Sequence, residues 1–139
     1  MNVDVNVRQI GDARSSRCDF NPASGAPALA RRFIRGYLAD AGADARCQQV
    51  AELLASELVT NAVTHASSTA RLSVTLADGV ARVTVTDDGP GRLSPRLPDD
   101  DGGYGLWLVD WLARSWGWDR TADGKAVWFT VPLDAGAWP

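Results

Sequence analysis

The sequence predicts an α+β protein, built as a two-layer sandwich with helices on one face of a mostly antiparallel sheet. Two observations predict this class. Apolar residues recur every three or four positions through residues 26–66, which is the period of amphipathic helices. From residue 70 onwards apolar and polar residues alternate instead, in two runs that a short turn joins. A second hairpin of the same kind follows near the end of the chain, so helices and strands segregate into two layers.

The first expected elements are a strand and a helix. Residues 1–14 are polar and mixed, and they could form either a loose arm or an edge strand. The segment SSRCDFNP could be a short strand that ends at Pro22. The segment at 26–42 is expected to be an amphipathic helix that Gly42 terminates, because its apolar residues have helical spacing: Leu29, Phe33 and Leu38.

A longer helix is expected from about Asp44 to Ala66, with Asp44 as its N-terminal cap. Its predicted apolar side consists of residues spaced three and four apart, namely Val50, Leu53, Leu54, Leu58, Ala62 and Val63. The hairpin that follows is expected to turn at residues 77–79 and to bury one face, formed by Leu72, Val74, Leu76, Val83 and Val85.

The remaining segments complete the sandwich. Residues 92–103 are expected to be a loop, residues 104–117 a helix, and residues 118–132 a second hairpin that turns at Asp123-Gly124. Residues 106–118 are apolar nearly all round, which indicates a segment that packs on its own sheet, on a second copy of the chain or on a partner.

Composition excludes several classes of function. The 139 residues suit one domain, and the net charge of −3 has no block of like charges, so neither direct nucleic-acid binding nor membrane-surface binding is expected. No apolar run approaches the roughly 20 residues that span a bilayer, and no signal peptide is visible, so a cytoplasmic location is expected. The two cysteines, Cys18 and Cys47, are expected to be ordinary thiols.

Three polar features indicate a site. Glu57, Asn61 and His65 recur every four residues along one helix, with Thr64 beside them, and a carboxylate and an amide oxygen one turn apart can hold magnesium or orient a hydroxyl. A polar strip at the edge of an apolar face costs free energy unless something pairs with it. Taken alone, however, this feature favours a solvated helix face, and the features that follow shift the balance towards a site.

The second and third features are rich in glycine. Asp87 ends a strand and precedes Gly89 and Gly91, which suits a carboxylate that accepts a hydrogen bond from an exocyclic amine, although a plain turn has the same chemistry. The third feature is GGYGLWLV, residues 102–109, where glycines directly precede a helix. Such a helix start suits phosphate, and a loop that merely enters a helix is the alternative.

Together these features resemble the ATP-binding domain of the GHKL superfamily (gyrase, Hsp90, histidine kinase and MutL), whose fold is the Bergerat type. The resemblance covers about residues 20–133 within a single domain at 1–139. ELVTNAVTHA is similar to the N box, DDGPG to the first glycine box, and GGYGLWLV to the second. GKAVWFTVP is similar to the box on the last strand.

The resemblance implies a role for each matching position. It implies that Asn61 binds magnesium, that Glu57 is the catalytic residue that activates or orients the nucleophile, and that Asp87 reads the amine of adenine. The other positions that it places in the cofactor site are His65, Gly89, Gly91, Gly103, Tyr104, Gly105 and Leu106. Residues 92–102 would form a short lid, in which Arg92 or Arg96 could face phosphate.

Within the superfamily, the chain looks most similar to anti-sigma-factor serine/threonine kinases. That resemblance implies ATP and Mg²⁺ as cofactors, and an anti-anti-sigma factor, a sigma factor or both as partners, with a possible homodimer. The sequence departs from the pattern at Thr64, where many relatives have a basic residue, and at Lys125-Ala126, near where a threonine often contacts the adenine. A non-catalytic ATP-binding module and a structural domain without nucleotide therefore remain alternatives.

Overall fold

The computed structural model describes residues 3–10, 13–20, 25–65, 70–88, 104–122, 124–134 and 136. These residues form one sheet of six antiparallel strands in the order β1-β2-β3-β4-β6-β5. The strands are β1 (Val3–Ile10), β2 (Ala13–Phe20), β3 (Ala70–Ala77), β4 (Val80–Asp87), β5 (Ser115–Arg120) and β6 (Lys125–Pro132). The helices are α1 (Ala26–Asp40), α2 (Ala45–His65) and α3 (Tyr104–Leu112).

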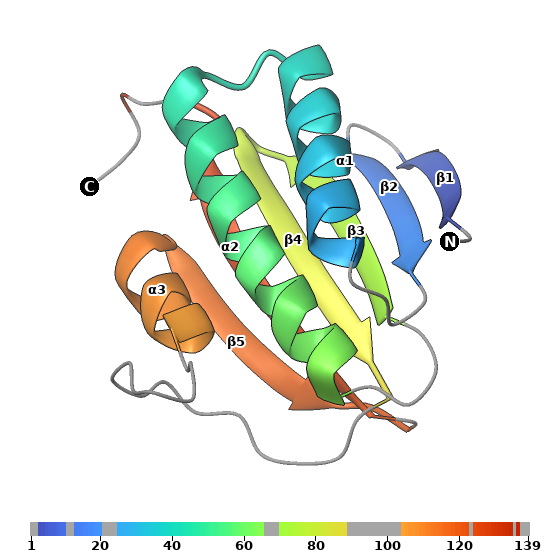
Figure 1. Ribbon diagram of the computed structural model, residues 1–139. Helices are drawn as coiled ribbons and strands as arrows, with labels where there is room; N and C mark the ends of the chain where they lie inside the picture. The colour runs from blue at the N-terminus through green and yellow to red at the C-terminus, as the bar shows by residue number, and fades with distance from the viewer. Residues whose placement is uncertain are drawn as a thin grey trace.

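The helices lie on one face of the sheet, with α1 on one side of α2 and α3 on the other (Figure 1). The predicted fold class, an α+β two-layer sandwich, is therefore confirmed. The N-terminal residues, which the sequence allowed to be an arm or an edge strand, form β1 at the edge of the sheet. No helix in the described part of the chain is long and apolar enough to cross a membrane.

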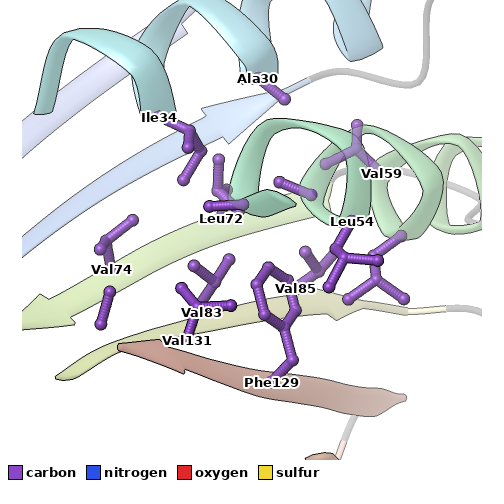
Figure 2. Close-up of a cluster of buried hydrophobic side chains, with 14 of the residues drawn as sticks. Ala30, Ile34, Leu54, Val59, Leu72, Val74, Val83, Val85, Phe129 and Val131 are labelled. Atoms are coloured by element: carbon purple, nitrogen blue, oxygen red, sulfur yellow. The ribbon is translucent and has the colours of Figure 1, made fainter. Parts of the chain in front are cut away.

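The core lies between the sheet and the two long helices. Every second residue of the central strands points inward, so the alternation seen in the sequence becomes one buried layer. Figure 2 shows these side chains meeting those of the helices, and its labelled residues are Ala30, Ile34, Leu54, Val59, Leu72, Val74, Val83, Val85, Phe129 and Val131. The predicted buried face of the first hairpin is confirmed.

Helix α1 begins and ends where the sequence indicated. Pro27 stands in its first turn, where a missing N–H does no harm. At the other end Gly42 adopts a φ of 79°, and Ala43 N–H donates to Leu38 O while Gly42 N–H donates to Ala39 O. This is the Schellman arrangement, and it confirms the glycine stop.

Helix α2 has the predicted cap, because Asp44 Oδ1 accepts a hydrogen bond from Cys47 N–H at 2.9 Å. Its predicted apolar side is wrong in part. Leu53 is 41% exposed, and Val50 and Val63 are only half-buried. The buried face is instead rich in small residues, and it consists of Cys47, Ala51, Leu54, Ala55, Leu58, Val59 and Ala62.

The expected helix at 104–117 is too long. Helix α3 ends at Leu112, and Arg114 N–H donates to Thr130 O, which brings the chain into the sheet. Trp116 and Trp118 then lie on β5, opposite Phe129 and Val127. The predicted helix included Trp116 and Gly117 because their surroundings are apolar, whereas Trp118 was expected in the hairpin. Alternate tryptophans also suit a strand, and pairing with β6 places Trp116 and Gly117 in β5 as well.

The first hairpin turn is as expected, and Asp123 of the second lies outside the described residues. Asp78 and Gly79 both have positive φ, 55° and 74°, as a two-residue hairpin turn requires. In the second hairpin, Thr121 N–H donates to Gly124 O at 2.9 Å. Cys47 is a free, buried thiol, and the side chain of Cys18 lies outside the described residues.

Candidate functional site

Several elements meet at one end of the molecule. Helix α2 contacts β4, β6 and α3. In Figure 1 the C-terminal end of α2 lies beside the end of β4, at the end of the sheet where the thin grey trace leaves β4. The polar residues at 57–65 and the carboxylate of Asp87 are thus carried to the same end of the sandwich by elements that are separate in sequence.

The polar residues of α2 lie on the flank that faces away from α1. Helix α1 is joined to the near flank by Arg35 Nε, 2.6 Å from Glu52 Oε1, and by Arg31 Nη1, which donates to Ser56 Oγ at 2.8 Å. An α-helix turns about 100° per residue, so Asn61 lies on roughly the opposite side of the axis from Glu52. This is the flank that borders α3 (Figure 1).

Glu57 and Asn61 are both half-buried, one turn apart at the edge of the apolar face. Neighbours on that face, Leu58 and Ala62, are buried. The two side chains therefore combine partial access to solvent with a fixed backbone. A carboxylate and an amide oxygen in this setting can orient a hydroxyl or bind a hard cation. His65 is the last residue of α2, and its side chain and that of Thr64 lie outside the described residues.

Asp87 is buried at the end of β4, and it is paired with a buried lysine. Lys125 Nζ donates to Asp87 Oδ1 at 2.9 Å, and the side chains are only 6% and 4% exposed respectively. The pairing follows from strand register, because Asp87 lies opposite Lys125 in the β4–β6 ladder. The lysine ammonium balances the charge of the carboxylate, since a buried charge needs an opposite charge or hydrogen bonds.

The sequence reasoning missed Lys125 as a site residue. It placed the position near the adenine at Lys125-Ala126 without separating the two, and the register separates them. Lys125 lies on the inward face with Val127 and Phe129, whereas Ala126 lies on the opposite face. A usable signal was present, since Lys125 is in phase with the apolar residues of its strand, where a charged residue is unexpected.

Lys125 is also the only lysine in the chain, although the chain has 14 basic residues. Every other basic residue is an arginine. The chain therefore has its one lysine at a buried position beside Asp87, whereas lysines usually lie exposed.

Gly124 brings the start of β6 close to the end of β4. A Cβ atom at Gly124 would overlap Asp87 O and would lie 2.6 Å from Asp88 Cα and 2.8 Å from Asp87 C. All three atoms belong to the backbone, which cannot move aside like the end of a side chain. The glycine is therefore required for the approach that places Lys125 beside Asp87.

Other predicted residues fall outside what the structure describes. These are Gly89, Gly91, Gly103 and the expected lid at 92–102 with Arg92 and Arg96. Helix α3 begins at Tyr104, directly after the glycines, and Gly105 and Leu106 belong to its first turn. A helix whose first residue directly follows glycines in the sequence has a start that suits phosphate.

The described residues could hold a magnesium ion only if water or a bound phosphate supplied most of its ligands. Within the described residues, no three His, Cys, Asp or Glu side chains gather closely enough to hold a metal ion. Asn61 offers an amide oxygen of the right hardness, and Mg²⁺ commonly completes its shell with water and substrate phosphates. The donor set therefore fits a phosphate-bound ion rather than a resident metal.

The fold and these features define a class, and comparison with known proteins identifies it. The chain belongs to the histidine kinase-like ATPase domain family, whose model matches residues 20–131. This confirms the resemblance to the GHKL superfamily.

Two relatives illustrate the membership. An uncharacterised protein of Streptomyces coelicolor is 38% identical over 81 residues, which are 52% of this chain and 75% of that protein. The crystal structure of the RsbU and RsbW domains of Rv1364c from Mycobacterium tuberculosis matches with a TM-score of 0.65 and 24% identity. It covers 84% of this chain, whereas this chain spans 32% of the length of that one. At that identity the likeness supports the fold alone.

Proposed function

We propose that the chain is an ATP-binding regulatory protein that transfers the γ-phosphate of ATP to a serine or threonine of a small anti-anti-sigma partner. The observation that carries the proposal is the family match. The matched residues include Glu57 and Asn61, which are half-buried on the flank of α2 that faces away from α1. The similarity to a structure that contains an RsbW domain agrees with this choice within the family.

The chemistry needs few residues, since phosphoryl transfer depends mainly on positioning and charge neutralisation. Glu57 would accept the proton of the partner's hydroxyl while the hydroxyl oxygen bonds to the γ-phosphorus. The bond from that phosphorus to the bridging oxygen breaks, and ADP leaves. Asn61 would hold Mg²⁺, which neutralises phosphate charge when bound. The backbone N–H groups at the start of α3 would cradle the phosphates.

The first test is ATP binding by calorimetry in the presence of magnesium. The parent chain should bind ATP saturably, and Asn61→Ala should bind it at least tenfold more weakly, because the cation that bridges protein and phosphates loses a ligand. Gln48→Ala is a matched control, because it removes a carboxamide from the opposite end of the same helix. This variant should bind ATP like the parent chain. A parent chain that does not bind ATP would contradict the proposal.

The second test is transfer itself. Radiolabelled ATP is incubated with the chain and a panel of anti-anti-sigma proteins, and labelled serine or threonine is then sought in the partner. Glu57→Gln should reduce the rate of transfer about 100-fold or more while leaving ATP affinity within threefold, since general-base catalysis contributes about 10²–10⁴. Glu52→Gln makes the same change on the α1 flank and should transfer at the parent rate.

A second candidate is a non-catalytic module in which bound ATP only controls a protein interface. It is favoured by Lys125, which lies opposite Asp87 near where relatives often have threonine. In that case ATP would change the affinity for a partner without any phosphate transfer. Phosphorylated partner detected by intact-mass measurement would exclude it.

A further inference from the structure

Helix α3 is short, and few of its side chains anchor it. Among its described side chains, residues 108–112, only Val109 is fully buried, and Leu108 and Leu112 are half-buried. A helix of nine residues is marginal by itself, so contacts with the rest of the chain determine where it lies. In Figure 1 it lies at the edge of the helical layer, beside α2, and its end leads towards β5. Its direction relative to the sheet therefore depends on few interactions.

Hydrogen bonds hold α3 to the sheet at two points. At the junction of α3 with β5, Arg114 N–H donates to Thr130 O at 2.9 Å, and the hydroxyl oxygens of Ser115 and Thr130 are 2.6 Å apart. The second point lies on the helix itself, where Asp110 Oδ1 accepts a hydrogen bond from Trp116 Nε1–H at 2.8 Å. Because two points along an axis set its direction, the bond between Asp110 and Trp116 controls the tilt of the helix.

The side chain of Trp116 is suited to this contact. Its ring packs against the core from a position opposite Phe129, while its N–H reaches the carboxylate of Asp110, which is exposed. A hydrogen bond near the surface competes with water, so its net contribution to the stability of the whole domain is modest. Its larger effect is on where the far end of α3 lies.

The far end of α3 is the end that the proposed function assigns to the phosphates. Helix α3 begins at Tyr104, and its nine residues correspond to a length of about 13 Å. A rotation of about 10° around its junction with β5 would therefore move the first turn by about 2 Å. That displacement is larger than the spread of distances over which an N–H group donates to oxygen.

We infer that Asp110 and Trp116 are positioning residues of the nucleotide site: their hydrogen bond holds α3 at the tilt at which the N–H groups of its first turn meet the phosphates. This inference rests on the proposed ATP-binding function. It goes further by assigning a role to two residues that lie outside all four sequence motifs. Because the bond acts on the phosphates and not on the base, its loss should weaken the binding of ATP and leave the binding of adenosine unchanged.

The test compares the nucleotide with its nucleoside. Calorimetry with magnesium measures the affinity of the full chain for ATP, and competition with a fluorescent ATP analogue measures its affinity for adenosine. Asp110→Ala removes the acceptor at an exposed helical position, where alanine is favoured, and Trp116→Phe removes the donor but keeps an aromatic ring. Each variant should bind ATP about three- to tenfold more weakly, the range set by the net contribution of one hydrogen bond, with adenosine affinity unchanged within about twofold.

Three further variants separate the hydrogen bond from other effects. Asp110→Asn removes the charge but keeps an oxygen acceptor, so it should recover most of the affinity for ATP. Trp128→Phe makes the same change as Trp116→Phe on the opposite face of the sheet, and it should bind ATP like the parent chain. The double variant Asp110→Ala/Trp116→Phe should bind ATP no more weakly than the weaker single variant, since both changes remove the same bond.

The coupling should also be measurable at the hydrogen bond itself. If the bond favours the position that binds ATP, bound ATP must favour the bond by the same factor, because coupling between two equilibria is reciprocal. The indole N–H signal of Trp116 can be identified among those of the six tryptophans by its absence from the spectrum of Trp116→Phe. Its hydrogen exchange should slow about three- to tenfold when ATP saturates the chain.

The outcomes separate the two proposals. No ATP binding by the parent chain would count against the proposed function itself. ATP binding that stays unchanged in both Asp110→Ala and Trp116→Phe would leave the proposed function standing and overturn the inference. Equal losses for ATP and adenosine would also overturn it, since the bond would then support only the fold, as would an Asp110→Asn variant as weak as Asp110→Ala. If Trp116→Phe does not fold, Asp110→Ala still decides.

Discussion

Replacing Gly124 by alanine should damage both the fold and the site. The new Cβ atom would overlap Asp87 O and lie 2.6 Å from Asp88 Cα, much closer than atoms of this kind approach in proteins. Because these contacts are with backbone, the start of β6 must move away from the end of β4. Overpacking typically costs about 1–3 kcal/mol. Alanine recovers about 0.4–1 kcal/mol by restricting the unfolded chain.

The expected net loss is therefore about 1 kcal/mol in the free energy of unfolding. For a chain of 139 residues this corresponds to a fall in Tm of roughly 3–6 °C. Thermal unfolding followed by circular dichroism measures it. The same shift separates Lys125 from Asp87, so affinity for ATP should fall about tenfold or more, measured by calorimetry well below the Tm.

Gly36→Ala is the matched control, because a Cβ atom there meets nothing within 4 Å and the residue lies inside α1. Alanine in a helix interior is favoured over glycine by about 1 kcal/mol, so this variant should be more stable than the parent chain. If Gly124→Ala instead matched the parent chain in both Tm and ATP affinity, the close approach of β4 and β6 would be refuted.

Three further predictions concern the core and α2. Leu54→Ala removes a fully buried side chain and should lower the free energy of unfolding by about 2–5 kcal/mol in urea titrations, whereas exposed Leu53→Ala should change it by less than about 1 kcal/mol. Asp44→Ala removes the cap of α2 and should lower it by about 1 kcal/mol, and Asp44→Asn, which keeps an acceptor, should lower it less. Desolvation by burial, and secondarily the charge of Asp44, raises the pKa of Cys47 from 9.0 to about 11, so stability should fall as the pH rises from about 9 to about 11, where the unfolded chain loses the thiol proton first. Cys47→Ala should remove that part of the fall, and a pH titration of thermal unfolding that shows no difference between the two would contradict it.

Much of the architecture could be predicted because it depends on how apolar residues are spaced along short segments of the chain. The spacing of Leu29, Phe33 and Leu38 predicted α1, and Gly42 predicted its end, since few other residues adopt positive φ there without strain. The alternation of residues 72–85 predicted β3 and β4 together with their buried face. The order of the polar motifs predicted the family, which the match at residues 20–131 confirmed.

The errors in the predicted elements arose where the spacing of apolar residues fits more than one arrangement. Leu53 fits the three-and-four spacing of α2, yet Leu53 is 41% exposed, whereas Ala51 and Ala55 on the same helix are fully buried. Trp116 suits a helix or a strand equally well, and a partner strand was needed to decide. The roles of Glu57, Asn61 and Asp87 as site residues remain predictions that the proposed experiments address.

The sequence by itself determined most of the elements and their order, because these follow from residues that are neighbours in the chain. Only the tertiary structure decided which groups meet. Lys125 and Asp87 are 38 residues apart, and their contact depends on the register of β4 against β6. A shift of one residue would have turned Lys125 to the other face of the sheet and brought Ala126 inward, since side chains alternate along a strand. Register is fixed by the packing of the whole inner layer, so the local pattern could mark Lys125 as unusual but could not show that it meets Asp87.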